Sequence, residues 1–153
     1  MLPGSVLFAC NYNRVRSPMA AGLMRRLYGS RVFVESVGVR LPAVAWGDDD
    51  SADAFVVSVM DELGVDLAVH RSRTFDDLED ESFDLIVSLT PEAHHRALEL
   101  TRRRSTDVEY WATLDPTLAT GTRDAVLCAY RGVRDGLQAR LLARFGPVRT
   151  FGG

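Results

Sequence analysis

Short apolar runs alternate along this chain with longer segments of helical spacing. The apolar runs are typical of strands and occupy residues 5–9, 31–36, 83–89 and 108–112. Segments with apolar residues three or four positions apart predict helices at residues 17–28, 53–63, 91–104 and 122–145. We expect one helical turn at residues 75–78, a loop at residues 37–50 and a loose tail at residues 146–153.

The order of these elements predicts the fold. Strands that alternate with helices favour a parallel sheet covered on both faces. We therefore expect an α/β fold with a single three-layer domain, in which a four-stranded parallel sheet carries helices on both faces. The 153 residues suit one domain over residues 1–153, and no repeat, low-complexity run or linker marks a second one.

Candidate chemistry follows the first strand. Cys10 ends the apolar run, five residues separate it from Arg16, and Ser17 and Pro18 open the predicted helix. Successive backbone N–H groups in such a loop can converge on one point and form an anion-binding nest at a helix N-terminus. A tetrahedral oxyanion would fit this nest, with the Cys10 sulfur beneath it as a nucleophile.

The neighbouring side chains suit that chemistry. Thiolates are favoured beside cations and helix N-termini. Arg16 has a planar fork that can hold two phosphoryl oxygens at once, which a lysine could not do. Ser17 can donate a hydrogen bond to the thiolate and later stabilise it as a leaving group. The alternative is a buried strand-end cysteine followed by an ordinary helix start.

Transfer of a phosphoryl group to Cys10 also needs a proton for the leaving oxygen. Asp115 is the best candidate for this general acid because it follows the last strand, and the carboxyl ends of parallel strands share one edge of the sheet. Pro116 would stiffen the loop. Asp-Pro is also a common turn-starting pair, which is the alternative interpretation.

The run at residues 6–10, together with Asn13 and the Arg-Ser-Pro-Met-Ala segment at residues 16–20, resembles the low-molecular-weight protein-tyrosine-phosphatase family. An Asp-Pro in the last loop carries the general acid in that family, which matches Asp115. The resemblance implies a phosphomonoester hydrolase, in the first place a protein-tyrosine phosphatase, that acts through a phosphocysteine intermediate. Its catalytic residues would be Cys10, Arg16, Asp115 and Ser17.

The resemblance also implies further site residues. The substrate-binding residues would be Asn11, Tyr12, Asn13, Arg14, Val15 and Trp46. Ser36 and His70 would support the loop together with Asn13, by pinning it and orienting Ser17. Trp46 could instead anchor its own loop, and His70 could be a hydrogen-bonded core histidine.

The chain departs from the family pattern around the substrate. Tyr12 stands where glycine is usual, Val15 where a second cysteine is common, and Asn11 where an apolar wall residue is found. Threonine and leucine at residues 117–118 replace tyrosines after the acid, and Arg14 adds a positive charge inside the loop. The transfer machinery is therefore expected to be complete, whereas phosphotyrosine specificity is the weakest part of the resemblance.

The composition of the chain limits the classes of binding partner and the cell compartment that we expect. A net charge of −3 argues against nucleic acid, and neither a membrane span nor a signal-peptide pattern is present. Two cysteines, Cys10 and Cys128, make no disulfide framework, so a reducing cytoplasm is expected. All 18 basic residues are arginine, which indicates a GC-rich, bacterial genome.

Neither a metal nor an organic cofactor is implied. Expected partners are a phosphorylated protein or small phosphomonoester, and a phosphate or sulfate anion in the loop.

Two other functions remain open. A non-catalytic module that binds phosphate or phosphoproteins would keep the nest, and Tyr12 could then plug the pocket. A thiol-dependent arsenate reductase on the same fold would pass oxidation to further cysteines. Only Cys128 is available, and its apolar neighbours predict a core position in the last helix.

Overall fold

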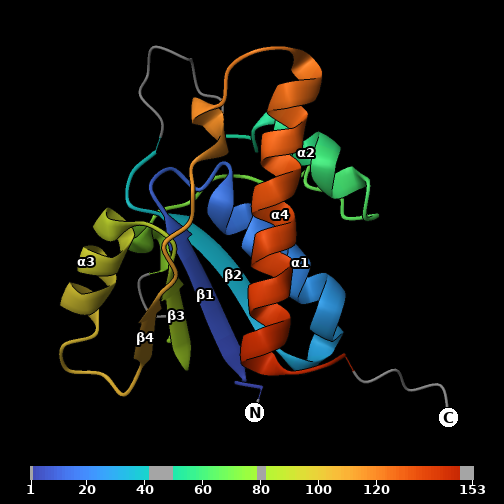
Figure 1. Cartoon of the computed structure of the whole chain (residues 1–153). Coiled ribbons are helices and arrows are strands. Elements are labelled where there is room, and N and C mark those ends of the chain that lie inside the picture. Colours follow the sequence, from blue (N-terminus) through green and yellow to red (C-terminus); the bar gives the residue numbers. More distant parts are fainter. Residues whose placement is uncertain (1, 42–49, 79–81, 149–153) are drawn as a thin grey trace, which may run out of the picture.

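Four strands form one sheet: β1 (Ser5–Cys10), β2 (Phe33–Gly38), β3 (Leu85–Ser88) and β4 (Asp107–Tyr110). Their order is β2-β1-β3-β4 and every neighbouring pair is parallel (Figure 1), which confirms the expected fold class. The computed structural model describes residues 2–41, 50–78 and 82–148. Trp46 and the last five residues of the tail lie outside these ranges.

The central strand β1 is apolar on both sides because helices cover both faces of the sheet. Val6, Phe8 and Cys10 belong to the larger core cluster, whereas Leu7 and Ala9 belong to a smaller cluster on the opposite face. Successive side chains of a strand point to opposite faces of the sheet, so an uninterrupted apolar run fits a strand that is buried on both faces. This alternation directs the Cys10 side chain to the face with the larger cluster.

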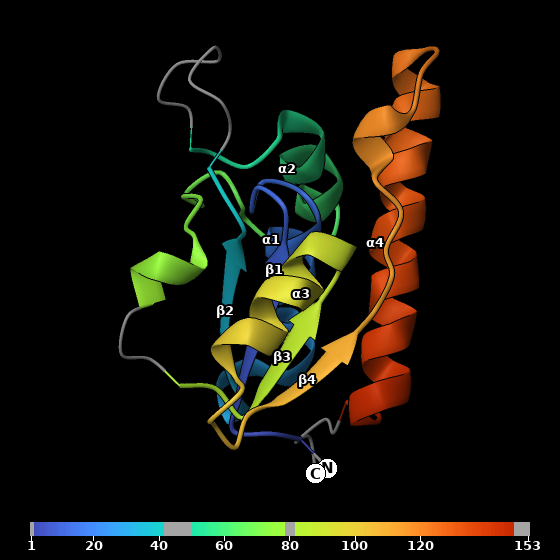
Figure 2. The same ribbon diagram turned by 90° about the vertical axis from the view of Figure 1, so that its left-hand side faces the viewer.

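The helices divide unequally between the two faces. The larger core cluster packs against α1 (Arg16–Tyr28), α2 (Ala54–Asp61) and α4 (Arg123–Phe145), and the smaller cluster against α3 (Pro91–Leu100). Figures 1 and 2 show α3 on one side of the sheet and α4 along the opposite side. The 3-10 turn Phe75–Leu78 also lies on the α3 side, where Phe75 and Leu78 belong to the smaller cluster. Asp53, Thr90 and Thr122 cap α2, α3 and α4 by accepting backbone N–H groups.

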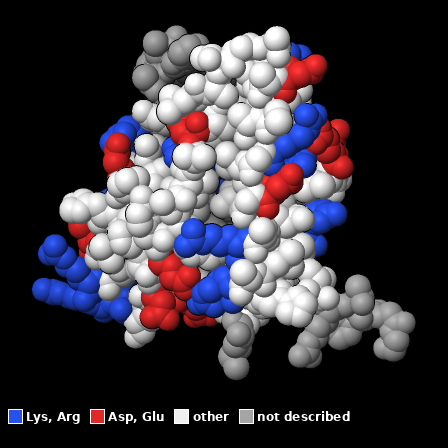
Figure 3. Space-filling model, in the orientation of Figure 1, with Lys and Arg blue, Asp and Glu red and all other residues white. Residues whose placement is uncertain are grey.

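Helix α4 buries one stripe and is anchored at its edges by ion pairs. Arg131 and Arg144 lie 2.7 Å from Glu62 and Glu109 respectively, and Figure 3 shows basic and acidic side chains next to one another on this face. The buried residues of the stripe are Leu127, Tyr130, Arg134, Leu137, Leu141 and Phe145.

The prediction that Cys128 is a core residue is wrong, because its side chain is exposed. One residue beyond Leu127 turns the side chain by about 100° around the helix, away from the buried stripe. Apolar neighbours in sequence therefore do not indicate the buried face of a helix.

Several element ends also differ from the prediction. A 3-10 turn (Gly29–Arg31) follows α1, so β2 begins at Phe33 rather than at residue 31. Helix α3 ends at Leu100 rather than at residue 104, where the Thr101 hydroxyl donates to the Ala97 carbonyl at 2.8 Å. The third and fourth strands are shorter than their apolar runs, because their length is set by the four residue pairs that β3 and β4 share. Among the described residues, no helix has both the length and the apolarity to cross a membrane.

Candidate active site

The loop between β1 and α1 lies at the carboxyl edge of the sheet, against the end of β2 (Figure 1). Val39 N–H donates to the Cys10 carbonyl at 3.0 Å and to the Asn11 carbonyl at 2.9 Å. A Cβ at Gly38 would lie 2.8 Å from both the Asn13 nitrogen and the Tyr12 carbonyl carbon. Backbone atoms cannot swing aside as a flexible side chain can, so this close approach requires glycine at position 38.

Cys10 and Ser17 are in contact. The Cys10 Sγ lies 3.0 Å from the Ser17 Oγ, and both residues are buried. The Ser17 hydroxyl accepts a hydrogen bond from Asn13 Nδ2 at 2.8 Å and donates one to the Val37 carbonyl at 3.2 Å. A hydroxyl has one proton, so with Asn13 donating to its oxygen, Ser17 can donate that proton either to the Val37 carbonyl or to a thiolate at Sγ.

The Asn13 side chain connects the loop to neighbouring segments through hydrogen bonds. Asn13 has a φ of 56° and is fully buried, a backbone conformation that asparagine tolerates better than most residues. Its Nδ2 also donates to Ser36 Oγ at 2.9 Å, and its Oδ1 accepts from Arg73 N–H at 3.0 Å. The structure thus brings Asn13, Ser17 and Ser36 into direct contact.

His70 holds the backbone of the same residue. Its Nε2 lies 2.8 Å from the Asn13 carbonyl, which can only accept, so Nε2 carries the proton. Burial lowers the pKa of His70, while the hydrogen bond to Asn13 opposes that shift. Ser72 Oγ donates to the same carbonyl at 2.9 Å, a contact that the sequence analysis missed.

The N-terminus of α1 differs from those of the other helices. Val15 occupies the N-cap position and provides no side-chain hydrogen bond, whereas α2, α3 and α4 each have a side-chain cap. The first N–H groups of a helix have no acceptor within the helix, and an anion is a suitable partner for them. This end of α1 meets the loop that begins at Cys10.

Arg16, in the first turn of α1, faces the loop that follows β4. Its Nη1 donates to the Thr113 carbonyl at 3.0 Å, and its Nη2 lies 4.0 Å from Asp115 Oδ2. The side chains of Arg16 and Asp115 are 13% and 31% exposed, so the pair lies at the mouth of the site. The predicted acid and the predicted phosphate-binding arginine are therefore neighbours, although 99 positions separate Arg16 from Asp115 along the chain.

The other oxygen of Asp115 is held from the opposite side. Asp115 caps a short 3-10 turn (Pro116–Leu118), and its Oδ1 accepts from Thr117 N–H at 3.0 Å and from Thr117 Oγ1 at 2.6 Å. The two carboxylate oxygens thus have different surroundings.

The loop side chains predicted to bind substrate have other partners. Asn11 Oδ1 accepts from Thr90 Oγ1 at 2.8 Å, and Arg14 Nε donates to the Ser51 carbonyl at 3.0 Å. Val15 is half-buried against the larger core cluster. Tyr12 is 44% exposed and its hydroxyl lies beside Arg40, so its side chain belongs to the rim of the site. The side chains of Asn11 and Arg14 are therefore bonded to other parts of the chain.

Tyr130 of α4 is a neighbour of the site that the sequence did not indicate. Burial raises its pKa, and the charges of Asp53 and Asp115 add to this shift. Its ring packs against Phe55, with 5.3 Å between centroids. Only the packing of α4 against α2 brings this hydroxyl near the acid, and no local pattern indicates it.

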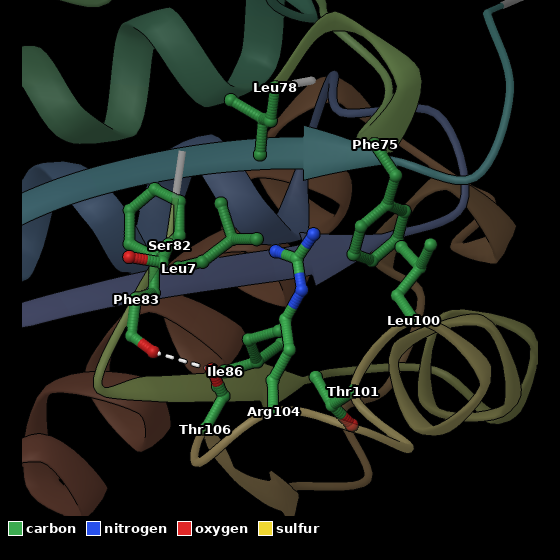
Figure 4. A pocket seen from close by; sticks show the side chains of 10 residues that line it. All are labelled: Leu7, Phe75, Leu78, Ser82, Phe83, Ile86, Leu100, Thr101, Arg104 and Thr106. Carbon is green, nitrogen blue, oxygen red and sulfur yellow. Dashed lines mark hydrogen bonds between the residues drawn. The ribbon is translucent and has the colours of Figure 1, made fainter. Parts of the chain in front are cut away.

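Of two hollows in the described part of the chain, one is lined by Asp115 and the other lies away from the site. A groove of about 560 Å³ separates the Asp115 loop from α4, where Gly132 and Gly136 leave room. A cavity of about 80 Å³ lies on the α3 side; Figure 4 shows Arg104 extending between Leu7 and Phe75 there, and none of the predicted site residues lines it. Within the described ranges, no three His, Cys, Asp or Glu side chains gather as metal ligands.

Comparison with known proteins relates this arrangement to one family. The model of the family described as low molecular weight phosphotyrosine protein phosphatase matches residues 5–139. An arsenate reductase of Halalkalibacterium halodurans is 29% identical over 136 residues, which cover 89% of this chain and 91% of that protein.

Solved structures share the fold. A YwlE mutant from Bacillus subtilis superposes with a TM-score of 0.72 at 24% identity and covers 92% of this chain and 97% of its own. The tyrosine phosphatase Wzb from Escherichia coli K30, in complex with sulphate, gives a TM-score of 0.72 at 20% identity and covers 95% of this chain and 100% of its own.

Proposed function

Because the chain belongs to the low molecular weight phosphotyrosine protein phosphatase family, we propose that it hydrolyses phosphomonoesters through a phosphocysteine intermediate, with phosphotyrosine in proteins as the main substrate class. The observation that carries the proposal is the gathering of Cys10, Ser17, Arg16 and Asp115 at the N-terminus of α1. Each of these residues has the chemistry that one part of the reaction needs.

The first step transfers the phosphoryl group to sulfur. The Cys10 thiolate attacks phosphorus in line, forming an S–P bond as the P–O ester bond breaks. Arg16 and the loop N–H groups hold the non-bridging oxygens, and Asp115 gives its proton to the leaving oxygen. The contact of Ser17 with Sγ, at 3.0 Å, supports a role in holding the thiolate before attack.

The second step releases phosphate. Asp115, now a carboxylate, takes a proton from water while the water oxygen attacks phosphorus and the S–P bond breaks. Sulfur leaves as a thiolate, which the Ser17 hydroxyl can stabilise. The cycle returns every group to its starting protonation state, and the positive charge comes from Arg16 and the N-terminus of α1. The thiolate must stay reduced throughout, so we expect the chain to act in the cytoplasm.

Arsenate reduction is the second candidate, since the Halalkalibacterium halodurans relative carries that name. A thiol relay within one chain needs further cysteines near the nucleophile. The sequence contains only Cys10 and Cys128, the first buried beneath the loop and the second exposed on α4. This arrangement favours hydrolysis over an internal relay. A non-catalytic binding module is also less favoured, because the acid lies beside Arg16 and the Tyr12 side chain lies at the rim.

Hydrolysis of p-nitrophenyl phosphate by the parent, Cys10→Ser and Asp115→Asn tests the proposal. We expect activity without added metal, complete loss in Cys10→Ser, and a loss of about 10²- to 10³-fold in Asp115→Asn. Phosphotyrosine peptides, phosphoserine peptides and arsenate with added thiols are then compared as substrates. An inactive parent that still binds phosphate would indicate the binding module, and turnover of arsenate alone would indicate the reductase.

A further inference from the structure

The carboxylate of Asp115 is asymmetrically bonded. Oδ1 accepts two hydrogen bonds from one residue, from the Thr117 N–H at 3.0 Å and from the Thr117 hydroxyl at 2.6 Å. Oδ2 instead faces the guanidinium of Arg16 at 4.0 Å. Asp115 Oδ2 is therefore the oxygen on the side of the phosphate-binding arginine, and Oδ1 is the oxygen turned away from it.

This asymmetry decides where a proton can reside. A protonated carboxylic acid keeps one oxygen as an acceptor and uses the other as the O–H donor. A proton on Oδ1 would compete with the Thr117 N–H and hydroxyl, which both donate to that oxygen. A proton on Oδ2 leaves both of these hydrogen bonds intact. A phosphoryl dianion held by Arg16 would also neutralise the guanidinium and so favour a proton on nearby Oδ2.

We infer that Thr117 is a positioning residue for the general acid: its hydroxyl fixes Asp115 Oδ1 as the acceptor and makes Oδ2 the oxygen that delivers the proton. The inference rests on the proposed function, because it concerns how Asp115 acts within it. In the first step the proton on Oδ2 passes to the leaving ester oxygen as the P–O bond breaks. In the second step Oδ2 takes a proton from the attacking water as the S–P bond breaks.

Substitution can remove the Thr117 hydroxyl without disturbing the rest of the turn. Thr117 is exposed, so its side chain contributes little packing, and its backbone N–H would still donate to Oδ1 after substitution. Valine has nearly the shape of threonine without the donor, and serine keeps the donor without the methyl group. The pair Thr117→Val and Thr117→Ser therefore isolates the hydrogen bond of 2.6 Å from the shape of the residue.

The test compares kcat/KM for two substrates that differ in their need for an acid. Phenyl phosphate releases a basic phenolate and needs the proton, whereas p-nitrophenyl phosphate releases a much weaker base. For Thr117→Val we expect a loss of about tenfold with phenyl phosphate and of about twofold or less with p-nitrophenyl phosphate. Asp115→Asn should show the same selectivity more strongly, and Thr117→Ser should return to the parent ratio.

Two results would overturn the inference while leaving the proposed function intact. One is a Thr117→Val variant with the parent ratio of the two kcat/KM values. The other is an equal loss with both substrates, which indicates a general disturbance of the site. If the parent shows no hydrolysis, or if Asp115→Asn matches the parent, the proposed function itself fails. Thermal melting and inhibition by inorganic phosphate establish that each variant is folded and keeps its anion site.

Discussion

Arg16 and Asp115 face each other across the mouth of the site, with 4.0 Å between Nη2 and Oδ2. The same guanidinium donates through Nη1 to the Thr113 carbonyl at 3.0 Å. Arg16 therefore links the loop after β1 to the loop after β4 and holds the acid near the nucleophile. In this protein the group that would bind phosphate also positions the group that would protonate the leaving oxygen.

Arg16→Lys should impair both tasks. Lysine keeps the charge but lacks the fork that reaches Thr113 and an anion together. We expect kcat/KM for p-nitrophenyl phosphate to fall by about 10²- to 10³-fold and inhibition by phosphate to weaken. Arg26→Lys is the matched control on the same helix, where the arginine is exposed and donates to the Leu63 carbonyl. A kcat/KM for Arg16→Lys equal to that of this control would contradict the dual role.

Asn13 should be required for stability in two separable ways. Asn13→Ala removes its side-chain hydrogen bonds and also forces alanine to a φ of 56°. Asn13→Gly removes the same bonds but tolerates that φ. We expect urea denaturation to show a loss of about 2–4 kcal/mol for Asn13→Ala, and about 1 kcal/mol less for Asn13→Gly. Equal losses would mean that the left-handed backbone carries no strain.

The lowered pKa of His70 predicts a pH dependence of stability. Its cause is burial, which disfavours the charged imidazole in the folded state. The unfolded chain then binds the proton more readily, so the His70 contribution is fully present above the unfolded pKa of about 6.5 and decreases as the pH falls below it.

His70→Gln tests this dependence, because glutamine can donate to the Asn13 carbonyl without titrating. Unfolding free energies between pH 5 and 8 should show a shallower decline on the acidic side for the variant. Arg25, Arg73 and Asp50 also face His70, and they remain in both proteins. Identical slopes of unfolding free energy against pH for parent and variant would contradict the assignment of this pH dependence to His70.

Substitution by alanine should have opposite effects on stability at two glycines. A methyl group at Gly38 would meet backbone atoms of the loop at 2.8 Å, so Gly38→Ala should destabilise the protein by about 1–3 kcal/mol and weaken phosphate binding. A methyl group at Gly132, inside α4, meets nothing within 4 Å. Gly132→Ala should therefore stabilise the protein by about 0.5–1 kcal/mol, as measured by urea denaturation. The close approach at Gly38 would be refuted if both variants gained stability.

The sequence by itself determined the parallel sheet, because apolar runs and helical spacing are local patterns that one chain displays directly. It also determined the juxtaposition of Cys10, Ser17 and Arg16, which lie within eight consecutive residues of a strand, a loop and a helix. Asp115 could be predicted despite its distance along the chain, since parallel strands end at one edge.

Only the tertiary structure decided which way the side chains turn. Asn11 turns to Thr90, 79 positions away, and Tyr130 approaches the acid through the packing of α4. Cys128 is exposed because the phase of α4 is fixed by its contacts with α1 and α2 rather than by its immediate neighbours. Such choices depend on partners from distant parts of the chain, and a linear pattern carries no information about them.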